Sequence, residues 1–402
     1  MSDFKERVQK RVEEILPELI GLSNTVWEHP EYNFEEFHAC KSMSGLLKKF
    51  GFEVTTGVGG IETSVKAVYD TGKEGPNIGI FGEFDAVPGM GHSCGHNLMC
   101  AMAVGAGEAV HSVIDDIGGK VTVFGTPAEE GGGGKIIMLN NGAFKELDIA
   151  MILHSASDTV VNDISYSRTD LIVDYYGKTS HAATWPEEGI SALNPILDLF
   201  QIVNSMRLEL ADKGKILGII SKGGEEPIYI PDHCQARFTI RSFSMKYKLE
   251  LLERFKKICE HVAEITNTRL EISDDGLAYE DIRNNQSLEE ALRKNFTDLG
   301  EIVKPRERAL GIGCTDMGNV THEIPGLQSY VLVVPETNNT IVEYLRRSSG
   351  IITEEGGANS HAAIVGLAMD KPVITGAEHA TDLLKSGAVV TLDAKTGRVS
   401  AC

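Results

Sequence analysis

The chain has 402 residues, 42% of them apolar and 24% charged, which suits a globular protein with two or three domains. Its formal net charge of −20 argues against nucleic acid or an anionic membrane as a partner. The seven cysteines are scattered and odd in number, which favours a reducing cytoplasm over a disulfide framework.

The first part of the chain predicts an alternation of helices and strands. Its charged N-terminal end predicts no signal peptide, and no apolar run approaches the length needed to cross a bilayer. Apolar residues at helical spacing predict helices over 3–28, 34–49 and about 96–112, and apolar runs predict strands over 52–69, 77–82 and 120–126. This alternation is typical of an α/β domain.

Polar residues follow three apolar stretches that are typical of buried strands. Residues 77–82 precede Asp85, residues 120–125 precede Glu129 and Glu130, and residues 149–153 precede His154. Strand ends that each deliver polar groups are the usual way in which open α/β sheets build sites.

Cys94, His96, Glu130 and His154 together offer sulfur, nitrogen and oxygen donors of the kinds that bind zinc, manganese or cobalt. Taken alone, a buried cysteine is usually a small hydrophobe and a pair of glutamates is usually solvated. The strand-end setting favours a metal site instead. Glu129 would point away from Glu130 on an extended or turning backbone, and is therefore available to take a proton from water that a metal activates. The chain is thus predicted to be a metal-dependent hydrolase.

Four consecutive glycines, Gly131 to Gly134, predict the start of a helix whose backbone N–H groups no side chain covers. They lack the Gly-Lys-Ser/Thr ending of a phosphate-binding P-loop. We therefore expect these glycines to let the backbone approach the metal cluster closely.

The pattern changes near residue 168, where an inserted α+β unit is expected. Strands are predicted at 171–176, 216–221, 235–242 and 269–273, with helices at 190–210 and 246–266. His181 follows the first strand and Arg241 lies in the third. Taken alone, His181 is typical of a turn and Arg241 of an exposed charge on a strand. A helix at 288–299 marks the return to the first domain, so the predicted domains are 1–167 with 287–330, 168–286, and 331–402.

Residues 1 to about 330 resemble the zinc-dependent aminoacylase/carboxypeptidase G family, especially its amidohydrolase branch of indole-acetyl-amino-acid hydrolases, aminobenzoyl-glutamate hydrolases and aminoacylase-like dipeptidases. The resemblance rests on these motifs: Trp27 to Glu31, Glu83 to Pro88, Cys94 with His96, Pro127 to Gly131, Ser180 to Ala182, Arg241, and Cys314 to Asn319. It implies an α/β metallopeptidase domain with an inserted α+β lid that also makes a homodimer.

The resemblance also implies roles for single residues. It makes Cys94, His96, Glu130 and His154 ligands of two divalent metal ions, zinc or manganese, and Glu129 the general base. His181 would reach a neighbouring subunit's site and steady the oxyanion, Arg241 would bind the substrate's carboxylate, and Asp85 would orient a ligand. The implied substrates are N-acyl amino acids or small dipeptides with a free carboxylate.

The likeness to that family stops near Tyr330, before the segment whose histidine supplies its last metal ligand. Residues 331–402 instead resemble a truncated swivelling phosphohistidine domain of phosphoenolpyruvate-using enzymes, and the extra C-terminal domain of pyruvate kinases. Ile351 to Gly366, Pro372 to Gly376 and Val390 to Ala394 carry that likeness. It lacks the opening strands of that domain, and Asn359 stands where a threonine is common.

Three consequences stay open at this point. The site could hold only one metal ion, with replacement of the missing ligand by His361, His379 or His322 the less favoured outcome. His361 could carry a phosphoryl group, although an inert remnant is the favoured reading of the tail. The chain could also be a catalytically dead binding protein.

Overall fold

The computed structural model describes residues 2–156, 158–306 and 312–333, together with the short segments 351–352, 372–374, 390–393 and 398–401. Internal contacts divide the chain into two units, one of 1–154 with 160–330 and one of 155–159 with 331–402. His361 and His379 lie outside the described residues, so the structure does not test the prediction of a phosphohistidine at His361.

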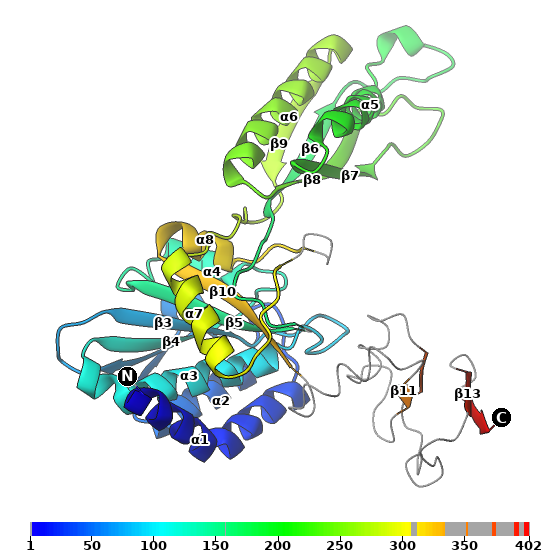
Figure 1. Ribbon diagram of the computed structural model, residues 1–402. Coiled ribbons are helices and arrows are strands. Elements are labelled where there is room, and N and C mark those ends of the chain that lie inside the picture. Colours follow the sequence, from blue (N-terminus) through cyan, green and yellow to red (C-terminus); the bar gives the residue numbers. More distant parts are fainter. Residues whose placement is uncertain are drawn as a thin grey trace. The chain divides into compact units, whose positions relative to one another are not determined.

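The first unit contains a six-stranded mixed sheet in the order β1-β2-β4-β3-β5-β10 (Figure 1). Its strands are β1 Glu53–Thr56, β2 Val65–Asp70, β3 Asn77–Glu83, β4 Lys120–Thr126, β5 Ile149–Ala156 and β10 Gly326–Leu332. β3 runs parallel to β4 and β5, whereas β2 is antiparallel to both β1 and β4. The α/β class is confirmed.

The single strand expected over 52–69 is wrong, because β1 and β2 form an antiparallel pair joined by a short 3-10 turn over Val58–Gly60. Gly57, Gly59 and Gly60 all have positive φ there. A Cβ on Gly59 would lie 2.7 Å from the Met138 backbone. The chain reverses at glycines whose backbone few other residues adopt.

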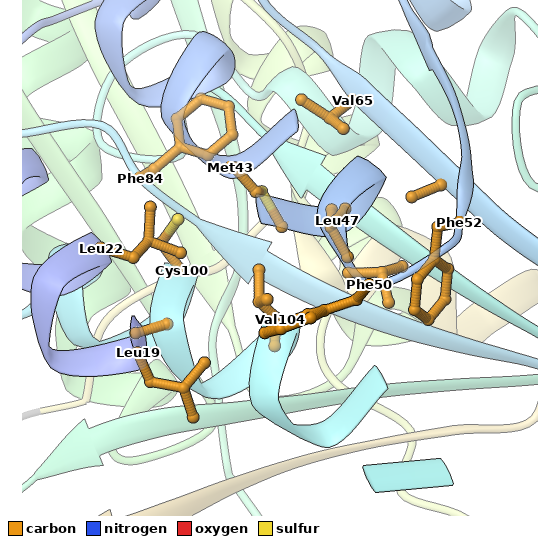
Figure 2. Packing of buried hydrophobic residues seen from close by; sticks show 14 of the residues in the cluster. Leu19, Leu22, Met43, Leu47, Phe50, Phe52, Val65, Phe84, Cys100 and Val104 are labelled. Atoms are coloured by element: carbon orange, nitrogen blue, oxygen red, sulfur yellow. The ribbon is translucent and has the colours of Figure 1, made fainter. Parts of the chain in front are cut away.

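Three helices pack with one face of this sheet: α1 Ser2–Glu28, α2 Phe37–Lys49 and α3 His96–Ile117. Their shared core joins leucines of the helices to valines of the strands and to Phe50, Phe52 and Phe84 of the connecting segments (Figure 2). By length and composition α3 could cross a membrane, contrary to the expectation from the sequence, but 67% of its most apolar window is buried. That burial and its contacts with α1, β3 and β4 make α3 a core helix.

A second apolar cluster joins the strands to two further helices, α4 Gly134–Asn140 and α8 Met317–Glu323. The rings of Phe81 and Phe124 stack there, and both meet Phe144 edge to face, with ring centroids about 5 Å apart. α7, Gln286–Asp298, belongs to the same unit, and the side chain of Asn285 caps it by accepting a hydrogen bond from the Leu288 amide at 3.2 Å.

The insertion forms an antiparallel four-stranded sheet in the order β7-β8-β6-β9 with two helices (Figure 1). Its elements are β6 Ser167–Tyr176, α5 Leu193–Leu210, β7 Gly214–Lys222, β8 His233–Ser242, α6 Met245–Thr266 and β9 Arg269–Asp274. The core contains Leu171, Val173 and Tyr175 of β6 with apolar residues of α5 and α6. Because side chains alternate along a strand, Arg168, Asp170 and their neighbours on β7 and β8 lie on the opposite face.

In the second unit, β11 Ile351–Ile352 pairs parallel with β12 Val373–Ile374, and β13 Val390–Asp393 pairs antiparallel with β14 Arg398–Ala401. None of the six cysteines in the described parts of the chain forms a disulfide.

Leu47→Ala tests the helix-to-sheet core of the first unit. Leu47 is 0% exposed, so its truncation leaves a cavity and is expected to lower the free energy of unfolding by about 2–5 kcal/mol. Urea denaturation followed by circular dichroism measures this. Leu16→Ala on α1, where the side chain is 47% exposed, is the control; equal losses for the two variants would contradict the assigned core.

Candidate metal centre

The parallel strands β3, β4 and β5 bring three chain segments to one edge of the sheet. Glu83 at the end of β3 lies opposite Thr126 at the end of β4, and Phe81 lies opposite Ile152 of β5. Residues 83–85, 127–130 and 154 therefore meet at the carboxyl ends of these strands, where open α/β sheets place their sites.

Cys94, His96 and His154 converge at this edge. One donor atom of each lies within 4.8 Å of the others, and the Cys94 Sγ atom is 3.6 Å from His154 Nε2. His96 also belongs to a second such group with Glu83 and Glu129. The two three-residue groups of donors thus share the buried imidazole of His96.

Asp85 determines the orientation of His96. His96 Nδ1 lies 2.9 Å from the Asp85 carbonyl oxygen and 3.0 Å from Asp85 Oδ1, both acceptors, so Nδ1 carries the proton and donates it. Burial alone would lower the pKa of His96, but the carboxylates of Glu83 and Asp85 outweigh burial and raise that pKa well above its usual value. Asp85 therefore fixes which nitrogen of His96 faces the cluster.

The other nitrogen of His96 shows that the residues fit a cation. His96 Nε2 is 3.2 Å from Glu83 Oε2, and both atoms are buried without a hydrogen-bond partner. Because the pKa of His96 is raised, a second proton on Nε2 compensates the Glu83 carboxylate when no metal is bound. A divalent cation can take the place of that proton, and the thiol, imidazole and carboxylate donors nearby suit a transition metal.

Glu129 and Glu130 take different positions although they are adjacent. The Glu130 amide donates to Asp85 Oδ2 at 2.9 Å, and Glu130 Oε1 lies 3.9 Å from His96 Nε2, with its side chain 23% exposed. Glu129 groups with Glu83 and His96. Burial, followed by the negative charges of Glu83 and Asp316, raises the pKa of Glu129 well above its usual value.

A strained residue separates these glutamates from β4. Ala128 has a φ of +56°, a region that residues with a Cβ rarely occupy, at a cost of about 1–3 kcal/mol. Its amide donates to Glu36 Oε1 at 3.2 Å, and Glu36 also accepts from the Phe34 amide and the Thr63 hydroxyl. The fully buried Glu36 carboxylate thus holds the turn that presents Glu129, a role that the sequence did not reveal.

A buried ion network that sequence reasoning missed lies directly behind the cluster. The Lys135 ammonium donates to Glu83 Oε1 at 2.5 Å and to Asp316 Oδ1 at 2.5 Å, and the Lys135 amide donates to Asp316 Oδ2 at 2.8 Å. All three side chains are at most 2% exposed. Lys135 and Asp316 lie in segments that the sequence had singled out, but no local signal showed that they pair.

The glycine run has a packing role that differs from the expected one. Cβ atoms built on Gly131 and Gly132 would meet the side chains of Asn33 and Phe34, and one on Gly134 would lie 1.9 Å from the Pro127 carbonyl oxygen. The run does start helix α4, as predicted. Its glycines allow close packing of α4 against the 33–34 turn and Pro127.

The remaining predicted residues are not members of the candidate ligand groups. His181 Nδ1 accepts hydrogen bonds from the Ala183 and Thr184 amides at 3.3 and 3.2 Å, and its ring contacts Tyr229 edge to face. Arg241 lies on the sheet face that bears no helix. His322, proposed as a replacement ligand, instead contacts Glu280 at 3.0 Å and the Asp281 carbonyl oxygen at 2.8 Å.

In the described part of the chain, the candidate ligand groups contain no residue that follows His154 in the sequence. The ring of Tyr330, at the junction between the two resemblances, lies 5.3 Å from that of His154.

Comparisons with known proteins agree with this architecture. Over 361 residues the chain is 30% identical to the Xaa-Arg dipeptidase of Mus musculus, spanning 85% of this chain and 82% of that one. A Bacillus subtilis protein described as a dinuclear metal-binding peptidase of the M20 family superposes with a TM-score of 0.66 at 20% identity, covering 80% and 89% of the two chains.

The C-terminal segment has separate relatives. A model of the mobile domain of PEP-utilising enzymes matches residues 327–397. Pyruvate kinase 2 of Synechocystis is 50% identical over 72 residues, which are 18% of this chain and 12% of that enzyme.

A model of peptidase family M20/M25/M40 matches residues 69–348, more than half of the chain. The match includes the segments that bring Glu83, His96, Glu129 and His154 to one edge of the sheet. The chain therefore belongs to peptidase family M20/M25/M40.

Proposed function

We propose that this chain hydrolyses the amide bond of small dipeptides or N-acyl amino acids that carry a free carboxylate, with Glu129 as the base. The observation that carries the proposal is the buried His96, which Asp85 orients and whose Nε2 meets an unpartnered carboxylate oxygen of Glu83. The similarity to an Xaa-Arg dipeptidase supports dipeptides as the first substrates to test.

Cys94, His96, Glu130 and His154 would hold the metal ions, zinc or manganese. Glu130 stands outside the two donor groups, with Oε1 3.9 Å from His96 Nε2, and Glu83 lies close enough to His96 to join the ligands. A bound divalent metal supplies a Lewis acid that lowers the pKa of water from 15.7 to about 7. Cys94 would have to lose its proton first, since burial raises the pKa of its thiol to about 11 without a metal. Metal binding would therefore release a proton from this thiol.

Glu129 would move the proton during the reaction. Its carboxylate accepts the proton of the attacking water and returns it to the leaving amine nitrogen, a role usually worth about 10²–10⁴-fold in rate. Its desolvated position between Glu83 and Asp316 favours the protonated form, so the acid that protonates the leaving group is readily formed.

In a homodimer, the insertion of one chain would complete the site of the other chain. The exposed edge strand β7, with Ile219 60% exposed, offers a surface for pairing between two chains. His181 contacts only its own loop and Tyr229 among the described residues, which supports a role at a neighbouring subunit's site. There it would stabilise the oxyanion.

We propose no phosphotransfer activity for the C-terminal segment. Its similarity to pyruvate kinase covers only 12% of that enzyme.

Glu129→Gln removes the proton acceptor while keeping the shape of the side chain. We expect kcat for a dipeptide such as alanyl-arginine to fall by about 10²–10⁴-fold with metal content unchanged. Glu146→Gln, at a side chain that is 75% exposed, is the control and should keep full activity. Retention of more than a tenth of the activity by Glu129→Gln would remove this residue from the proposed role.

His154→Ala tests the ligand set. Since His154 lies within the Cys94/His96 group, its loss should reduce bound metal per chain, measured by mass spectrometry of the purified protein, and abolish hydrolysis. His261→Ala, an exposed histidine on α6, should change neither quantity. Stoichiometric metal in His154→Ala would contradict the assignment, and metal-loaded wild-type protein inactive on all dipeptides and N-acyl amino acids would favour a binding protein.

Sedimentation equilibrium of the full chain tests the proposed homodimer. Wild-type protein should sediment at twice the chain mass, and Ile219→Lys on β7 should shift the equilibrium to monomer because it buries a charge between the chains. Lys256→Glu on α6 is the control. A monomeric wild-type protein at micromolar concentration would contradict the dimer.

A further inference from the structure

Lys135 is a buried cation that Asp316 holds at two points. The Lys135 ammonium donates to Asp316 Oδ1 at 2.5 Å, the Lys135 backbone amide donates to Asp316 Oδ2 at 2.8 Å, and the lysine side chain is 0% exposed. The start of α4 is itself packed closely, because a Cβ on Gly134 would lie 1.9 Å from the Pro127 carbonyl oxygen. The position of the ammonium is therefore fixed by α4 and by the segment before α8, and it does not depend on Glu83.

The same ammonium determines how the Glu83 carboxylate is turned. Lys135 donates to Glu83 Oε1 at 2.5 Å, and the other oxygen, Oε2, lies 3.2 Å from His96 Nε2. The Glu83 side chain is only 2% exposed, and Oε2 has no hydrogen-bond partner among the described residues. Asp85 holds His96 through the other ring nitrogen, with Oδ1 3.0 Å from Nδ1. Two buried groups thus fix the facing atoms Oε2 and Nε2, between which a divalent ion can replace a proton.

A buried ammonium acts on a nearby metal ion in two opposing ways. Its charge repels the ion, and this repulsion is strong where water does not screen it. Its hydrogen bond holds a ligand oxygen in place, and partners of this kind are usually worth about 10- to 100-fold in metal affinity. The two effects can be separated, because they predict opposite orders of metal affinity in matched variants.

We propose that Lys135 is a positioning residue of the metal centre, which turns Glu83 Oε2 toward His96 and so makes Glu83 a further metal ligand. The inference rests on the proposed metal-dependent hydrolysis and adds Glu83 to the ligands given there. Lys135 touches neither the substrate nor the metal and acts only through Glu83. Because Asp316 anchors the ammonium, Glu83 keeps this orientation before any metal binds, as a preorganised ligand does.

The zinc affinity of the metal-free full chain, measured by competition with a chromophoric chelator, tests the proposal. Asp316→Asn is the matched control, because Lys135 can still hold Glu83 in that variant. Lys135→Met combined with Asp316→Asn has the same net charge as the wild type but no ammonium to hold Glu83. We expect this double variant to bind zinc about 10- to 100-fold more weakly than Asp316→Asn. Charge alone predicts the reverse order, since the single variant is the less negative of the two.

Zinc binding by the double variant that is as tight as that of Asp316→Asn, or tighter, would overturn the positioning role. Circular dichroism shows whether each variant is folded, and Glu83→Gln replaces the double variant if that one is not. The amide oxygen of Glu83→Gln can still accept from Lys135 while the second carboxylate oxygen is lost, so zinc affinity should again fall about 10- to 100-fold. Wild-type affinity in Glu83→Gln would exclude Glu83 as a ligand.

These measurements contain no substrate, so they separate the positioning role from the proposed hydrolysis. A chain that shows the expected order of zinc affinities but hydrolyses no dipeptide or N-acyl amino acid would keep the role of Lys135 and refute the hydrolysis. An active chain whose double variant binds zinc as tightly as Asp316→Asn would refute the role of Lys135 and keep the hydrolysis.

Discussion

The candidate metal centre depends on one buried arrangement of charges, the Lys135 ammonium held between the carboxylates of Glu83 and Asp316. It ties the end of β3, the start of α4 and the segment before α8 at a place that water does not reach. Removing one member of such a network usually costs about 3–5 kcal/mol, because an uncompensated charge stays buried. One ammonium between two carboxylates leaves a net negative charge beside the candidate ligands. That surplus is what makes a bound cation favourable here.

The geometry of the adjacent glutamates follows from a strained turn. Ala128 adopts a positive φ, and the Glu36 carboxylate accepts its amide and so stabilises a backbone that would otherwise relax. The turn lets Glu129 group with His96 and Glu83 while the Glu130 amide is held by Asp85. Strain of this kind persists where the surrounding structure over-determines it, typically at functional sites.

The insertion presents one face of its sheet that no helix covers. Its helix-free face collects cations from three strands, and the Tyr279 and Gly313 segments connect that face to the loops that carry Glu129 and Asp316. The C-terminal segment is related to a different group of proteins, and the described candidate ligands do not extend into it.

Apolar runs and the polar residues after them were enough to predict the α/β alternation, the strand ends before Asp85 and Glu129, and the inserted α+β unit, because burial periodicity is local in the chain. The strand expected to end before His154 instead runs on to Ala156, so His154 lies within β5. The break between β1 and β2 was missed since its glycines lie within a continuous run of strand-like residues. Glu83, Lys135 and Asp316 resemble solvated charges until the sheet order and the packing of α4 bring them together. The pairing of Arg168 with Arg241 likewise exists only through the register of β6 and β8, which no local pattern determines. Tertiary structure decided these contacts because each joins residues that are distant in sequence.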